Sequence, residues 1–348
     1  MHDGLMRVLV LGGTAFVGRA VVEAALACGW QVTTFNRGQT GEDVPRVEPV
    51  RGDRYDPRAV AALATNGPWD AVIDTSGYVP RNVLDVASTL APQAGRYVFV
   101  STVSAYEGWP TEPLTEASAV LPCPPDAGPD YGIDTEDGPT KYGYQKAGCE
   151  AAAVKAFGTS RVVVLRPGVV LGPREYVGRL PWWLRRVARG GSVIAPGTPD
   201  RTIQPVDVRD VANFVVSSSS RDLNGAYNLT GPARRDTFGG LLAACADATG
   251  GNAEFVWTAD EVLVAHGVRQ WSEMPLWRTA QGVWAVDSAR AASEGLHCRP
   301  LAETVRDTWA WMQSRGDLGD HERAGEIGLS ADHERELLSA VARVRHYS

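Results

Sequence analysis

The residues best suited to acid–base chemistry are a tyrosine and a lysine four positions apart, Tyr142 and Lys146. The stretch that follows, 147–157, is helical in composition, and residues four apart on a helix lie on one face. A phenol and an ammonium group can therefore meet at one site, where the ammonium favours the phenolate and lowers the tyrosine pKa towards the range of a working acid or base. The pattern Y-x-x-x-K is common by chance, so its weight depends on its surroundings.

Two hydroxyl residues upstream strengthen this site, because they end an apolar run. Residues 97–100 are Tyr-Val-Phe-Val, which is typical of a buried strand, and Ser101 and Thr102 follow directly. Ligands of open α/β folds bind at the carboxyl edge of the sheet, where such strand ends lie. We therefore expect these hydroxyls to lie at the edge of the sheet where ligands bind, which strengthens the interpretation of Tyr142 and Lys146 as catalytic.

A glycine-rich turn near the N-terminus indicates a dinucleotide site. It follows the apolar run 7–11 and leads directly into a helical stretch, as a phosphate-binding turn requires. Glycine lets the backbone bend tightly and approach a pyrophosphate, which then lies against the amides at the start of the helix. Ala15 takes the middle glycine position of G-x-x-G-x-x-G and adds only a methyl group. The residues that we expect to contact the cofactor here are Gly12, Gly13, Thr14, Phe16, Val17 and Gly18.

The residues after the next strand favour NADP over NAD. A carboxylate at the end of the strand 31–35 would accept a hydrogen bond from the ribose 2′-hydroxyl, but this chain has Asn36-Arg37-Gly38 there. A guanidinium pairs with a 2′-phosphate, so Arg37 favours NADP; the alternative is that Arg37 is a solvated surface charge and that NAD binds. Asp53 falls where a carboxylate can accept from the adenine amino group, and Ser76 is a further expected cofactor contact.

The composition is that of an ordinary globular protein of enzyme size. The chain has 348 residues, 44% hydrophobic and 22% charged, and its net charge of −7 argues against general nucleic-acid binding and gives no support to docking on an anionic membrane. No apolar run is long enough to cross a bilayer, and the N-terminus lacks the pattern of a signal peptide. Five scattered cysteines and six unclustered histidines predict free thiols, no metal site and a cytoplasmic location.

These residues need a parallel sheet to bring them together, and the first half of the chain has the pattern of one. Helical stretches such as 17–28 and 57–64 alternate with short β-rich runs. The runs cover residues 7–11, 31–35, 71–74, 96–101 and 161–165. Apolar runs without strict alternation indicate strands buried on both faces. We therefore predict an α/β fold, a Rossmann-type doubly wound parallel sheet with a smaller interleaved C-terminal substrate lobe.

The domain boundaries follow from changes in composition along the chain. We predict a Rossmann dinucleotide-binding domain over residues 1–172, which also receives returning segments near 202–230. Residues 173–316 are expected to form mainly the substrate-binding lobe, with most of its tryptophans in the core. Residues 317–348 are expected to form a helical tail, amphipathic over 334–344, that packs on the body or on a partner subunit.

Taken together, these motifs resemble the extended short-chain dehydrogenases/reductases, a family that includes nucleotide-sugar epimerases, dehydratases and reductases. The resemblance covers most of the chain, and the segments that carry it are 12–18, 101–102, 142–146, 165–173, 206–212 and 227–229. It implies that Thr102 polarises the substrate carbonyl, that Tyr142 passes the proton and that Lys146 also binds the nicotinamide ribose. It also implies that the turn after the strand 161–165 lies along the nicotinamide, with Pro167 and Val169 in contact.

Departures from the family pattern favour reduction among the family's reactions. Dehydratases carry an acidic pair after the strand hydroxyl, where this chain has Val103-Ser104. The asparagine usual in sugar-nucleotide enzymes is absent from Gly168-Val169-Val170, and Arg201 lies further than usual ahead of Asp210. We expect hydride transfer between NADPH and a carbonyl group of a small molecule, with Tyr142 as proton donor. The alternatives are an NAD(P)-dependent sugar or nucleotide-sugar epimerase and a non-catalytic NADP-binding sensor or scaffold, and a homodimer is left open.

The stretch between Thr102 and Tyr142 is long, at 142 − 102 = 40 positions, and is rich in proline and acidic residues. Long segments beside active sites are often functional, so residues 107–139, which include Trp109, are a candidate lid. The alternative is a decorated surface loop.

Overall fold

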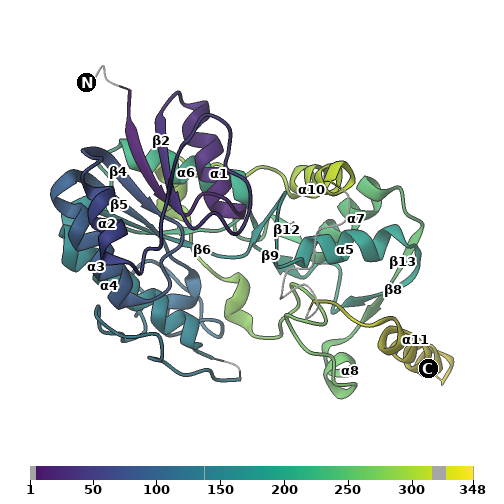
Figure 1. The fold of residues 1–348 in the computed structure, drawn as a ribbon. Coiled ribbons are helices and arrows are strands. Elements are labelled where there is room, and N and C mark those ends of the chain that lie inside the picture. The colour runs from purple at the N-terminus through teal and green to yellow at the C-terminus, as the bar shows by residue number, and fades with distance from the viewer. Residues whose placement is uncertain (1–4, 137, 316–326, 348) are drawn as a thin grey trace.

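Seven parallel strands form the centre of the N-terminal half of the protein (Figure 1). The computed structural model describes residues 5–136, 138–315 and 327–347. The strand order is β11-β6-β5-β4-β1-β2-β3. The chain adds β2 and β3 on one side of β1 and then β4, β5 and β6 on the other, so the direction of winding reverses between β1 and β4. The strands are β1 (Arg7–Leu11), β2 (Gln31–Asn36), β3 (Glu48–Arg51), β4 (Trp69–Asp74), β5 (Ala94–Val100), β6 (Val162–Pro167) and β11 (Gly225–Leu229). The predicted doubly wound sheet is confirmed, and such a reversal opens a ligand crevice at the carboxyl ends of the strands.

Helices cover both faces of the sheet, because its central strands are apolar on both faces. In β1, Val8 and Val10 belong to one core cluster, whereas Leu9 and Leu11 belong to another on the opposite face. The first face is covered by α1 (Phe16–Ala27) and α6 (Val208–Ser220). The second is covered by α2 (Pro57–Ala64), α3 (Pro80–Leu90) and α4 (Lys141–Phe157).

A smaller lobe lies beside the sheet and has a core of its own (Figure 1). Its main elements are α5 (Arg179–Ala188), β8 (Gly191–Pro196), α7 (Phe238–Thr249), β13 (Ala253–Thr258), α8 (Asp260–Ala265) and α10 (Leu301–Arg315). Strands β8 and β13 pair in parallel, and the fully buried Trp183 and Trp277 are the largest side chains of this core. The lobe is interleaved with the sheet, because the chain returns to form α6 and β11 before it continues into α7.

The C-terminal helix α11 (Ala331–Tyr347) packs on this smaller lobe. Its Leu337 is fully buried in the lobe's core, and the buried carboxylate of Glu334 accepts from Arg186 Nε on α5 at 2.7 Å. The amphipathic helix predicted near 334–344 is therefore present, although the preceding residues 316–326 lie outside the described part. No helix in the described ranges is long and apolar enough to cross a membrane.

The proline-rich segment 107–139 forms hydrogen bonds with residues 285 and 287 and with α4. Two of its residues, Trp109 and Leu114, are buried. Leu114 N donates to Ala285 O at 2.9 Å, and Leu114 O accepts from Asp287 N at 2.8 Å. Further along, Gln145 Nε2 on α4 donates to the carbonyl oxygens of Gly128 and Tyr131. The segment is thus packed against its surroundings, and its action as a lid stays a prediction.

Candidate dinucleotide and catalytic site

The glycine-rich turn brings the start of α1 against β1 and β4. Gly12 and Gly13 have φ values of 107° and 98°, in the left-handed region that favours glycine. A Cβ atom on Gly12 would lie 2.6 Å from Thr75 Oγ1, and one on Gly18 would lie 2.9 Å from the backbone nitrogen of Gly13. Gly12 therefore requires glycine for both conformation and space, Gly13 for conformation and Gly18 for space.

Ala15 is the N-cap residue of α1, and no side chain caps this helix. The amides of an uncapped first turn need an acceptor, and an anion such as a pyrophosphate provides one. The departure from the glycine pattern at Ala15 thus leaves the phosphate end of the site compatible with a dinucleotide. Thr14, Phe16 and Val17 lie in or directly beside this turn, as predicted from their positions.

The adenosine end of the site is formed where β2 and β3 end side by side. Asn36 closes β2, and its amide donates to Gly12 O at 3.2 Å and accepts from Gly38 N at 2.8 Å. Arg37 is exposed, and its side chain forms no hydrogen bond or ion pair within the described residues. Asp53 lies just beyond β3 and accepts from Tyr55 N at 3.0 Å. Arg51, which was not predicted as a site residue, lies beside Asn36 on the neighbouring strand β3 as its register partner.

A buried ion pair supports Ser76 behind the cofactor edge. Arg54 Nη1 and Nη2 each donate to Asp74 at 2.9 Å, and Tyr97 donates to the same carboxylate at 2.7 Å. Burial opposes ionisation of Asp74, but the Arg54 guanidinium outweighs it and holds the pKa of that carboxyl below its ordinary value. Ser76 Oγ accepts from Arg54 Nη1 at 3.0 Å, so the pair fixes this predicted cofactor residue in place.

Lys146 belongs to α4, and its side chain reaches the carboxyl end of β5. Its ammonium is buried and donates to Val100 O at 2.6 Å and Gly77 O at 2.9 Å. It also lies 4.2 Å from the centre of the Phe99 ring. Burial lowers the pKa of Lys146 from its ordinary value, although the two carbonyls favour the charged form geometrically.

Thr102 follows β5, and Tyr142 lies in the first turn of α4; these two segments pack so closely that a Cβ atom on Gly143 would clash with Ser104 O. The Thr102 hydroxyl accepts from Ser104 N at 3.1 Å and is near enough to the Tyr142 phenol to influence its pKa. The start of α4 is fixed by Thr140, whose hydroxyl accepts from Gly143 N at 3.2 Å. The two residues predicted to be catalytic therefore lie on adjoining segments at the edge of the sheet.

The predicted direction of the Tyr142 pKa shift is wrong for the protein without a ligand. Desolvation raises the pKa of Tyr142 above its ordinary value, the Tyr78 and Tyr176 phenols raise it further, and the nearby Thr102 hydroxyl only partly opposes them. Tyr142 is 45% exposed, so solvent still reaches the ring and its desolvation is partial. The Lys146 ammonium does not reverse this direction, because it is held by backbone carbonyls beneath the site.

Two aromatic residues near these hydroxyls, Tyr78 and Tyr176, were not predicted from the sequence. The Tyr78 and Tyr142 rings lie 6.4 Å apart, and both residues are exposed. On the other side, Tyr176 packs edge-on against Phe16 of the glycine-rich turn, with ring centres 6.0 Å apart. Tyr78 and Tyr176 belong to loops far apart in sequence, so only the fold reveals that both border Tyr142.

The turn after β6 closes the nicotinamide side of the predicted site. Pro167 ends β6 opposite Leu229, and Gly168 N donates to Leu229 O at 3.0 Å. Val169 O accepts from Val206 N at 2.9 Å, which ties this turn to the returning segment. The backbone of the turn is thus held by β11 on one side and by β10 (Val206–Asp207) on the other. The contact of Pro167 and Val169 with a cofactor stays a prediction.

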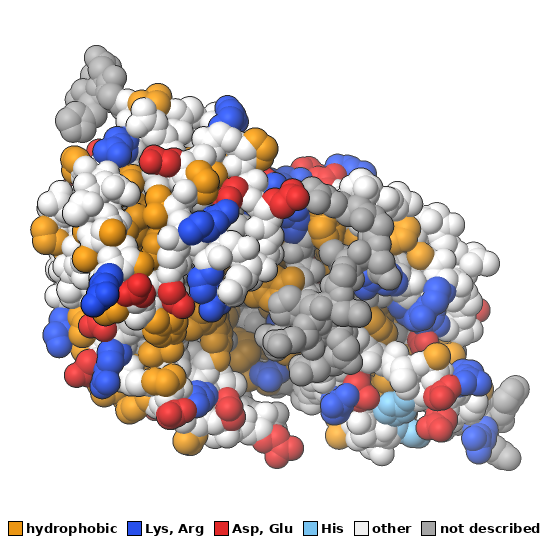
Figure 2. All heavy atoms as spheres, viewed as in Figure 1, with side chains coloured by type: hydrophobic (Ala, Val, Ile, Leu, Met, Phe, Trp, Pro, Cys, Tyr) orange, Lys and Arg blue, Asp and Glu red, His pale blue; other side chains and the backbone are white. Residues whose placement is uncertain are grey.

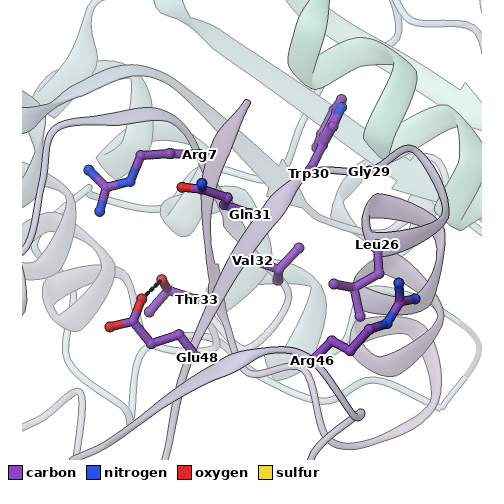
Figure 3. Close-up of a pocket in the computed structure, with 9 residues that line it drawn as sticks. All are labelled: Arg7, Leu26, Gly29, Trp30, Gln31, Val32, Thr33, Arg46 and Glu48. Atoms are coloured by element: carbon purple, nitrogen blue, oxygen red, sulfur yellow. Dashed lines mark hydrogen bonds between the residues drawn. The ribbon is translucent and has the colours of Figure 1, made fainter. Parts of the chain in front are cut away.

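A cavity of about 300 Å³ lies elsewhere, at the amino edge of the sheet (Figure 3). Arg7 and Gln31, the first residues of β1 and β2, line it together with Trp30, Arg46 and Glu48. The predicted catalytic residues lie at the opposite, carboxyl edge, so this cavity is separate from the candidate site. Among the described residues, no group of three or more metal-ligating side chains comes together.

The fold and this edge define a Rossmann-type nucleotide-binding protein of the extended short-chain dehydrogenase/reductase class. Residues 8–229 match the family model described as "NAD dependent epimerase/dehydratase family", and the chain belongs to this family. An NAD(P) cofactor is typical of its members.

The curated relatives include two reductases. The chain is 34% identical to 2′-dehydrokanamycin reductase of Streptomyces kanamyceticus over 56% of its own length and 52% of that protein. It is 32% identical to 2-alkyl-3-oxoalkanoate reductase of Stenotrophomonas maltophilia, over 49% and 52%. A third relative is the chloroplast stem-loop binding protein of 41 kDa b of Arabidopsis thaliana, at 24% over 70% and 63%. The chain thus spans about half to two-thirds of the length of these relatives.

Solved structures of two enzymes share the fold. WbmG of Bordetella bronchiseptica, in complex with NAD and UDP, superposes with a TM-score of 0.67 at 18% identity, covering 90% of this chain and 96% of that one. UDP-glucose 4-epimerase of Thermotoga maritima gives a TM-score of 0.65 at 18% identity, covering 89% and 99%. At these identities the likeness establishes the architecture alone.

Proposed function

We propose that this protein is an NADP-dependent reductase that converts a carbonyl group of a small molecule to an alcohol. The observation that carries the proposal is the close packing of the first turn of α4, which holds Tyr142, against the segment after β5, which holds Thr102, beside the buried Lys146 and at the edge where the glycine-rich turn leaves α1 uncapped. The two reductases among the relatives support it. The sequence departures at Val103-Ser104 and in the turn after β6 argue against the nucleotide-sugar reactions of other members.

The residues of this chain divide the work of such a reaction among them. A bound NADPH would supply the hydride that is transferred to the carbonyl carbon. The hydroxyls of Thr102 and Tyr142 hold the carbonyl oxygen, and Tyr142 gives its proton to the developing alkoxide. The phenol is protonated at neutral pH, although its raised pKa makes it a weaker acid than a free tyrosine. Lys146 stabilises the phenolate that remains, until a proton from solvent restores it.

The experiment that tests the proposal follows NADPH absorbance together with product formation across a panel of ketones and aldehydes. We expect one NADPH to be consumed for each alcohol formed. Conversion of a sugar without net consumption of cofactor would instead favour the epimerase alternative. Tight NADPH binding with no oxidation across the panel would favour a sensor or scaffold.

Replacement of Arg37 by alanine tests the cofactor assignment. We expect it to weaken NADPH binding by about tenfold and NADH binding by less than about twofold, because a charge-assisted hydrogen bond to the 2′-phosphate is lost. The measurement is the dissociation constant of each cofactor from its fluorescence on binding. Equal weakening of both cofactors would show that Arg37 does not read the 2′ position.

A further inference from the structure

Arg51 occupies the point of the sheet edge where a dinucleotide fold reads the ribose 2′ position. The side chain that ends β2 performs that reading, and here it is Asn36. Arg51 ends β3 directly beside it, and Arg51 Nη1 donates to Asn36 Oδ1 at 2.9 Å. The guanidinium therefore stands against the amide that replaces the carboxylate of an NAD-type site.

The hydrogen bonds of Arg51 leave one edge of its guanidinium available. Nη1 donates to Asn36 and, at 3.2 Å, to Asp43 Oδ1, and Nη2 donates once to Asp43 Oδ2. A guanidinium has five N–H donors, so within the described residues the Nε–H and one Nη2–H remain. These two lie on the same side of the guanidinium and form a fork that matches two oxygens of a phosphate.

Gly38 makes room for this available edge. Its φ of 70° is in the left-handed region, and a Cβ atom there would lie 2.8 Å from Arg51 Nε. A side chain at this position would therefore press on the guanidinium. The neighbouring loop is also held in place, because Thr40 Oγ1 bonds to Thr14 Oγ1 at 2.7 Å and Glu42 O accepts from Arg19 Nη1 at 2.9 Å.

Arg51 and Arg37 differ in how well they are positioned before any ligand binds. Both arginines are exposed, but Arg51 is held by Asp43 and Asn36, whereas the Arg37 side chain forms no hydrogen bond or ion pair within the described residues. Fixing a free side chain costs conformational entropy on binding, and a side chain that is already fixed avoids that cost. Asp43 removes part of the positive charge, but the fork itself is oriented by that ion pair.

We propose that Arg51 is a main reader of the 2′-phosphate and sets the preference for NADP, with Arg37 closing over the phosphate from the β2 side. This inference rests on the proposed NADP dependence and adds a residue from a second strand to it. Asp43 and Asn36 act as positioning residues that orient the fork. Ligands that carry the same group, such as 2′-AMP, should be recognised by the same edge.

The test compares dissociation constants of NADPH and NADH for the wild type, Arg51→Ala, Arg51→Lys and Arg37→Ala. We expect Arg51→Ala to weaken NADPH by about 10- to 100-fold and NADH by less than about twofold, and to exceed the effect of Arg37→Ala. Arg51→Lys should fall between, since lysine keeps the charge and loses the fork. Competition by 2′-AMP, measured against 5′-AMP, should weaken in parallel. Arg189→Ala, an exposed arginine of the smaller lobe, is the control for loss of one positive charge.

The outcomes separate this inference from the function on which it rests. A wild type that binds NADPH and NADH equally would overturn both the NADP assignment and the role of Arg51. A wild type that prefers NADPH, with an Arg51→Ala variant that keeps the preference, would overturn only the role of Arg51. Equal weakening of both cofactors in Arg51→Ala would assign Arg51 to holding the loop at Asp43, and would also overturn the inference.

Discussion

Replacement of Tyr142 by phenylalanine is expected to lower turnover by about 10²- to 10⁴-fold and to leave NADPH affinity within about twofold. The change removes the only atom by which this ring can give a proton, and it keeps the ring that packs near Tyr78. Steady-state rates with the best carbonyl substrate, together with the NADPH dissociation constant, measure the two effects. The loss should appear in kcat, because proton transfer belongs to the chemical step.

Tyr144→Phe is the matched control for that variant. Tyr144 lies two residues further along α4 and packs against Tyr131, with ring centres 6.3 Å apart. Its hydroxyl forms no hydrogen bond within the described residues, so its removal should leave turnover unchanged. If Tyr142→Phe turned over as fast as Tyr144→Phe, Tyr142 would have no place in the mechanism.

Replacement of Glu150 by glutamine is expected to cost about 3–5 kcal/mol of the free energy of unfolding. Glu150 is buried on α4 and accepts from Arg166 Nε at 3.0 Å, from Arg166 Nη2 at 2.5 Å and from the Ser101 hydroxyl. The glutamine removes the negative charge and leaves the buried Arg166 guanidinium uncompensated. Urea unfolding followed by tryptophan fluorescence measures the loss.

Two further variants show whether the charge is the cause. Glu23→Gln breaks a surface pair with Arg19, and Glu23 is 47% exposed, so it should cost less than about 0.5 kcal/mol. Glu150→Met combined with Arg166→Met removes both buried charges and should recover much of the stability lost in Glu150→Gln. A Glu150→Gln variant as stable as Glu23→Gln would contradict this account.

The sheet could be predicted from sequence because its central strands are apolar on both faces. The predicted run 7–11 coincides with β1, and the helix predicted at 57–64 coincides with α2. No strand was predicted at β3, because Glu48-Pro49-Val50-Arg51 has one aliphatic residue and lies exposed at the edge of the sheet. That strand carries Arg51, so the same weak pattern concealed a candidate cofactor residue.

The candidate site was predicted where it depends on local motifs and missed where it depends on packing. Thr102, Tyr142 and Lys146 come together because a strand end and a helix turn place them, and both signals are short-range. Tyr176 borders Tyr142 from a distant loop, and no spacing in the sequence indicates that contact. The direction of the Tyr142 pKa failed for a related reason, since Y-x-x-x-K shows the ammonium but not the two carbonyls that hold it.

The backbone hydrogen bonds between Leu114 and residues 285 and 287 affect how the chain folds during its synthesis. The bridge between Leu114 and Val286 joins positions 286 − 114 = 172 residues apart. At a synthesis rate of about 5–20 residues per second, its second half emerges on the order of 10 to 30 s after the first. During that interval Trp109 lacks the Trp271 ring that packs against it in the folded protein. The nascent chain therefore has an apolar surface that a chaperone can shield, and chains truncated before residue 270 should aggregate.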